Sequence, residues 1–135
     1  MVLAPSHGGL LPYWLLVTSA ASLFNTIGCY TTPRIALTTY EGRLAESQVT
    51  AFGARMFGTW TALSCVMRLV AAYNITEPSV YYLALCTYFV ALSHFASEWL
   101  VFGTMKAGRG IAPVLIVPTF SIMWMTTQRN FYLAA

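Results

Sequence analysis

A carboxylate and an imidazole lie four residues apart in a segment that is otherwise almost entirely apolar, ALSHFASEWLVFG over residues 91–103. The two residues are His94 and Glu98. In a helix this spacing places both side chains on one face. Such a titratable pair can act as general acid and general base on a bound substrate. It can also hold helices together inside a membrane, where charged groups are rare and usually face protein or water.

An arginine in the preceding apolar segment offers a partner for this carboxylate. Arg55 and Glu98 lie at about the same sequence distance from a short turn centred between Thr76 and Glu77. If the two segments form an antiparallel helical hairpin, both side chains reach the same depth near one end of it. The sequence therefore predicts an Arg55–Glu98 ion pair that forms, with His94, a structural polar clasp between two helices.

A second arginine, Arg68, lies in the same apolar segment and points to roughly the opposite face from Arg55. It can snorkel to the nearer membrane interface, or meet Asn25 of the first apolar segment, or meet a ring such as Tyr81. The sequence does not choose among these partners. Arg68 and Asn25 are therefore predicted only as secondary intramembrane polar residues.

Motifs for other kinds of chemistry are missing from the sequence. His94 and Glu98 are too few to hold a metal ion, and no further cluster of ligands supports them. No nucleophile elbow, phosphate-binding loop or dinucleotide-binding glycine pattern is present. The three cysteines form no CxxC pair, and the seven basic residues are spread along the chain. We therefore expect no catalytic residue, cofactor, metal ion or nucleic-acid partner.

The composition indicates which elements must position the polar residues. Of the 135 residues, 58% are hydrophobic and 8% are charged, whereas a soluble domain carries roughly 25% charged residues. The sequence therefore predicts a single all-α domain over residues 1–135, a polytopic protein embedded in a lipid bilayer. A bilayer core of about 30 Å needs about 20 helical residues per span. The four predicted spans cover about 12–31, 54–73, 79–103 and 111–128.

The connections between these spans suggest a topology. The stretch NITEP over 74–78 is a tight turn, so spans two and three are predicted to form a tight antiparallel hairpin. The loops 32–53 and 104–110 would share the opposite side and carry most of the basic residues outside the spans. The positive-inside rule then places them in the cytoplasm. The basic residues of these two loops are Arg34, Arg43, Lys106 and Arg109.

Two longer runs resemble the characteristic blocks of the ergosterol biosynthetic protein 28 family. They are ARMFGTWTALSCVMRLVAAYNI over 54–75 and ALSHFASEWLVFGT over 91–104. Residues 13–27 and 113–125 are similar to the first and last spans of the family more loosely. The positions that match the family blocks are Arg55, Phe57, Gly58, Thr59, Trp60, Arg68, His94, Ser97 and Glu98.

The resemblance implies a non-catalytic, multi-pass scaffold of the endoplasmic reticulum membrane that acts in sterol biosynthesis. Family members tether the sterol C-4 methyl oxidase, the decarboxylating 3β-hydroxysteroid dehydrogenase and the 3-keto sterol reductase. Association with sterol C-24 methyltransferase is attributed to fungal members. Tethering raises the effective concentration of successive enzymes around insoluble intermediates. Which helix touches which enzyme, whether the chain forms a homo-oligomer and whether a sterol binds between its helices stay open.

Two other functions are compatible with the sequence. One is a small membrane sterol isomerase that uses Glu98 and His94 as acid and base. The other is a channel or carrier subunit, which only the prolines of the fourth span support.

Overall fold

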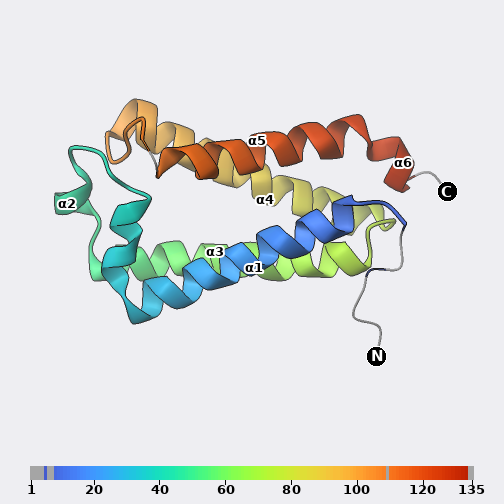
Figure 1. Ribbon diagram of the computed structural model, residues 1–135, viewed down its shortest axis with the longest axis horizontal. Helices are drawn as coiled ribbons and strands as arrows, with labels where there is room; N and C mark the ends of the chain where they lie inside the picture. Colours follow the sequence, from blue (N-terminus) through green and yellow to red (C-terminus); the bar gives the residue numbers. More distant parts are fainter. Residues whose placement is uncertain (1–4, 6–7, 109, 134–135) are drawn as a thin grey trace.

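A computed structural model describes residues 5, 8–108 and 110–133, and the elements it forms there are all helical (Figure 1). The predicted all-α fold is thus confirmed. The four long helices coincide with the four predicted spans, and the short elements lie between or after them. In chain order they are α1 (Leu11–Thr31), η1 (Pro33–Thr38), α2 (Ala45–Gln48), α3 (Ala51–Tyr73), α4 (Pro78–Ser97), η2 (Glu98–Phe102), α5 (Ile111–Thr127) and α6 (Arg129–Leu133).

The long helices are arranged as two pairs, α1 with α3 and α4 with α5 (Figure 1). Helices α3 and α4 run antiparallel across a four-residue connection, 74–77, as predicted. The two helices contact each other less extensively than the predicted tight hairpin requires. Helix α3 instead packs mainly against α1. Gly58 permits this approach, since a Cβ there would lie 3.0 Å from the Cβ of Cys29. Thr26 then donates a hydrogen bond of 2.8 Å across the pair to the Gly58 carbonyl.

Local sequence signals explain where the helices begin and end. Thr50 caps α3 by accepting a hydrogen bond of 2.9 Å from the Gly53 amide. Helix α4 begins with Pro78, whose missing amide costs nothing in the first turn. Helix α4 is followed directly by the π-helical segment η2. This segment ends at Gly103, whose φ of +75° suits a residue without a side chain. Helix α5 continues through Pro118.

One helical stretch in the described part of the chain is long and apolar enough to cross a membrane, Pro78–Phe102. Helix α5 is apolar but shorter, at 17 residues. Helices α1 and α3 have the length but not the apolar composition. The four-span arrangement therefore stays a prediction. It gains support from the large apolar side chains exposed on outer helix faces, such as Phe24 (75%), Leu63 (62%) and Ile116 (63%).

The two loops that were predicted to share one side do lie together, at the end of the bundle that includes α2 (Figure 1). The Gly42 amide donates to the Thr104 carbonyl at 2.7 Å, and the Gly110 amide donates to the Glu41 carboxylate at 2.7 Å. Gly42 lies directly against the backbone of residues 103–105, where a Cβ would not fit. Of the four basic residues assigned to these loops, Arg109 lies outside the described residues.

Candidate functional site

The imidazole of His94 contacts a tyrosine that sequence reasoning did not single out. Its Nε2 lies 2.7 Å from the hydroxyl oxygen of Tyr40, which follows η1 in the long loop. Tyr40 is 7% exposed, and its ring packs edge-on against Phe57. Burial, with a smaller contribution from the Glu98 charge, holds the pKa of the Tyr40 hydroxyl well above its ordinary value. Tyr40 therefore stays protonated, and it ties the loop to the last turn of α4.

Glu98 is oriented by the turn that follows it. Its Oε2 accepts a hydrogen bond of 2.8 Å from the hydroxyl of Thr104, and its backbone carbonyl accepts one of 3.1 Å from the Thr104 amide. Thr104 is buried. Glu98 is also the first residue of η2, and π-helical turns frequently lie at functional sites. The Glu98 carboxylate therefore contacts Thr104, six residues further along the same chain.

The predicted ion pair between Arg55 and Glu98 is not formed. Arg55 is exposed near the start of α3, and its side chain takes part in no ion pair across residues 8–108 and 110–133. In that part of the chain the ion pair within 4 Å joins Arg34 to Glu46, at 3.3 Å on the surface. Equal depth along a hairpin did not determine how each helix is rotated about its axis. Helix α3 turns toward α1, while Tyr40 occupies the position beside His94.

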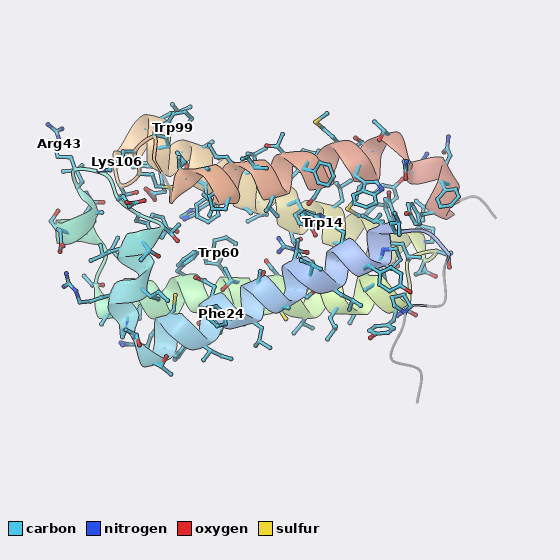
Figure 2. All side chains as sticks on the ribbon, viewed as in Figure 1. Trp14, Phe24, Arg43, Trp60, Trp99 and Lys106 are labelled. Atoms are coloured by element: carbon cyan, nitrogen blue, oxygen red, sulfur yellow. The ribbon has the colours of Figure 1, made fainter. Side chains whose placement is uncertain are left out.

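His94, Glu98, Tyr40 and Thr104 line a cavity of about 280 Å³ near the loop end of the bundle. Trp60 forms part of the same wall and lies in the space between the helix pairs (Figure 2). The two titratable side chains that the sequence predicted to act together thus share a cavity, but each is already engaged by a hydroxyl group.

Arg68 lies at the centre of a second polar cluster. It is 6% exposed; its Nε donates to the Thr87 hydroxyl at 2.9 Å and its Nη1 donates to the Ser22 hydroxyl at 3.0 Å. Its ζ-carbon lies 4.1 Å from the ring centroid of Tyr88, a cation–π contact. The Tyr88 hydroxyl is in turn 2.7 Å from that of Thr18. The ring that meets Arg68 is therefore Tyr88 rather than the Tyr81 that the sequence had suggested.

Asn25 lies near this cluster without a hydrogen bond to Arg68. Its Nδ2 donates to the Thr61 hydroxyl at 3.2 Å, which joins α1 to α3. Asn25 and Arg68 nevertheless line one cavity of about 270 Å³. The structure thus brings together the two polar residues that the sequence predicted inside the membrane. The serine and threonine partners were missed because single hydroxyls in apolar helices are too common to indicate a contact.

The sequence of the chain is similar to known proteins over most of its length. The family model described as "Erg28 like protein" matches residues 11–123. The chain belongs to the Erg28 family. This confirms the resemblance read from the two blocks, and the match takes in both polar clusters. No solved structure matches the chain.

Curated relatives of the chain come from fungi, animals and a plant. The protein named ergosterol biosynthetic protein 28 from Saccharomyces cerevisiae is 43% identical, over 96% of this chain and 87% of the relative. The protein of that name from Candida albicans is 40% identical, over 97% of this chain and 94% of the relative. The human ergosterol biosynthetic protein 28 homolog is 34% identical, over 86% of this chain and 82% of the relative.

Proposed function

We propose that the chain is a non-catalytic scaffold of the endoplasmic reticulum membrane that tethers the enzymes of sterol C-4 demethylation. The partners are the sterol C-4 methyl oxidase, the decarboxylating 3β-hydroxysteroid dehydrogenase and the 3-keto sterol reductase. Sterol C-24 methyltransferase is a further partner in this proposal. The observation that carries it is the match to the Erg28 family, whose relatives are named for ergosterol biosynthesis, across nearly the whole chain.

The surface of the molecule suits a tether. Apolar side chains cover the outer faces of the long helices, which suits contact with lipid or with the helices of partner enzymes. The end of the bundle formed by the loops 32–53 and 104–110, called the polar end below, carries Arg43 and Lys106, which are both exposed and labelled in Figure 2. Holding successive enzymes on one body raises the effective concentration of each insoluble intermediate at the next enzyme.

Purification of the native complex tests the proposal. The tagged full-length chain would replace its relative in Saccharomyces cerevisiae and be purified from gently solubilised membranes. We expect mass spectrometry to recover the C-4 demethylation enzymes, and gas chromatography to show that the chain prevents accumulation of 4-methyl and 4-carboxy sterols. Recovery of none of these enzymes would contradict the tether.

Charge-reversal variants locate the contact surface. We expect the double variant Arg43→Glu/Lys106→Glu at the polar end to lose enzymes from the purified complex, because it inverts the charge offered to partners. The matched control is Arg129→Glu, which reverses an exposed arginine in α6, outside these loops. Equal loss of partners from both variants would mean that the polar end is not the contact surface.

The alternative function is a sterol isomerase in which Glu98 and His94 act as acid and base. It is favoured by their shared cavity of about 280 Å³. Glu98→Gln separates the two functions, because the amide still accepts a hydrogen bond from Thr104 but donates no acidic proton. An isomerase would lose turnover of sterol by the purified chain, whereas a tether has no turnover to lose and keeps its partners.

A further inference from the structure

Within the described part of the chain, the buried positive charge of Arg68 has no carboxylate beside it. Its identified hydrogen-bond acceptors are two neutral hydroxyls, those of Thr87 and Ser22. Across residues 8–108 and 110–133, no acidic side chain lies within 4 Å of its guanidinium. An uncompensated buried charge is costly in an apolar interior, and binding of an anion removes much of that cost.

Arg68 lines a cavity of about 270 Å³ whose lining contains both polar and apolar residues. The other polar residues of the lining include Thr18, Ser64 and Tyr88. All four long helices contribute to the lining. Most of the remaining lining is apolar and includes the rings of Trp14, Phe57, Trp60 and Phe95.

From the exposed residues of its lining we infer that the cavity opens to the outside between α1 and α5. Val17 and Ala21 of α1 line the cavity and are also exposed, as is Pro113 of α5. Trp14 and Trp60, which are labelled in Figure 2, lie along the space between the two helix pairs. A molecule held by this cavity would therefore have its polar group at Arg68 and its apolar body against the rings, with a way out at the rim.

We propose that this cavity binds an amphiphilic lipid with a carboxylate head group, which pairs with the Arg68 guanidinium. Arg presents several N–H donors in a fixed fork, and the two identified hydrogen bonds leave others for a carboxylate. The apolar lining suits an apolar body, for which the two candidates are a carboxylated sterol and a fatty acid. The sterol body rests on the proposed function, whereas the site and its acidic head group do not.

Tryptophan fluorescence reports on this cavity directly. Trp14 and Trp60 line it, while Trp99 and Trp124 do not. The full-length chain with Trp99→Phe and Trp124→Phe, purified in detergent, would be titrated with 9,10-dibromostearic acid, whose bromines quench nearby indole rings. The methyl ester of the same lipid is the matched probe without the charge. We expect the acid to quench at concentrations lower by at least about tenfold, the factor expected from one hydrogen bond to a charged group.

Two variants on neighbouring residues test the location. Ala21→Phe adds a ring at the rim of the cavity, and Ala20→Phe adds the same ring to an exposed position that is not part of the lining. We expect Ala21→Phe to abolish quenching by the acid and Ala20→Phe to preserve it. Both sites are exposed, so neither change disturbs the packed core. Equal quenching of the two variants would overturn the site.

Arg68→Gln tests the head group. We expect it to remove the preference for the acid over the ester, and a preference that survives would overturn the pairing with Arg68. If this variant does not fold, the comparison of acid with ester in the parent chain still tests the charged head group, since equal quenching by both would overturn the proposal.

Competition identifies the body of the lipid. Displacement of the brominated acid by cholesteryl hemisuccinate at lower concentration than by oleate supports a sterol ligand, and the reverse order supports a fatty acid. Failure of both to displace it would show that the quenching is not saturable binding and would overturn the site. These measurements use the purified chain alone, so their outcome is independent of whether sterol enzymes are recovered with it.

Discussion

At the scale of single residues, hydroxyl groups rather than charges hold the polar side chains in place. Tyr40 contacts His94, and Thr104 donates to Glu98. Arg68 donates to both Ser22 and Thr87. Hydroxyls both donate and accept, so they form hydrogen bonds to an acid, a base or a cation without the desolvation cost of a second charge, although they do not neutralise the first one.

Tyr40→Phe is expected to destabilise the fold by about 1–3 kcal/mol, because it leaves Nε2 of His94 without its partner in a half-buried site. Thermal unfolding in detergent measures the change. Tyr30→Phe is the matched control, since the Tyr30 hydroxyl bonds Thr59 on the exposed surface, where water replaces it. A similar loss in both variants would contradict the importance of the Tyr40–His94 contact.

Two serines on α1 are expected to differ sharply although both are buried. Ser22 accepts from Arg68, so Ser22→Ala should cost about 1.5–3 kcal/mol, the range for a hydrogen bond to a charged group. The Ser19 hydroxyl has no hydrogen-bond partner among the described residues, so Ser19→Ala should leave the unfolding temperature unchanged or raise it. Denaturation of both variants in one detergent checks this, and equal effects would be inconsistent with the assigned contacts.

The polar residues could be predicted from the sequence, but their partners could not. Arg68, Asn25, His94 and Glu98 are conspicuous because charged and amide groups are rare in apolar segments, and each of them lines one of the two cavities. The pairing of Arg55 with Glu98 failed because depth fixes only one of the coordinates that bring two side chains together. Tyr40 lies in an irregular loop, where no periodicity indicates which way a side chain points.

At the scale of elements, the α1–α3 pair depends on a residue without a side chain. Gly58→Leu should weaken the fold by about 1–3 kcal/mol, because the new side chain would enter space held by Cys29. Gly53→Leu is the control on the same helix, where a Cβ meets its nearest atom at 3.4 Å, an ordinary contact. Unfolding midpoints compare the two, and a tolerated leucine at 58 would show that the helices can separate.

The positions of the long helices followed from the sequence far better than their packing did. Runs of apolar residues between polar loops marked α1, α3, α4 and α5, and the 74–77 turn set α3 and α4 antiparallel. Which helices pair closely depends on small surface details such as Gly58, which the apolar pattern does not distinguish. The π-helical ending of α4 likewise gave no signal in the hydrophobic pattern.

At the scale of the whole molecule, the two loops at the α2 end should face the same side of the membrane. We expect a cysteine introduced at Arg43 or Lys106 to be labelled by an impermeant maleimide added outside sealed microsomes, in a background without the three native cysteines. A cysteine at Glu77, in the turn between α3 and α4, should be labelled only after the vesicles are opened. Labelling of all three positions from outside would contradict four spans.

Contacts join the two helix pairs at both ends of the bundle as well as between the ends, where Arg68 of α3 donates to Thr87 of α4. At one end the Leu11 amide donates to the Tyr132 hydroxyl, and nearby the Trp14 indole donates to Ser121. At the other end the Gly42 amide reaches Thr104. The rim at Val17, Ala21 and Pro113 lies along the flank of the bundle. If the four predicted spans cross the membrane, a guest would arrive and depart sideways, within the plane of the leaflet, and would pass to a neighbouring protein without crossing water.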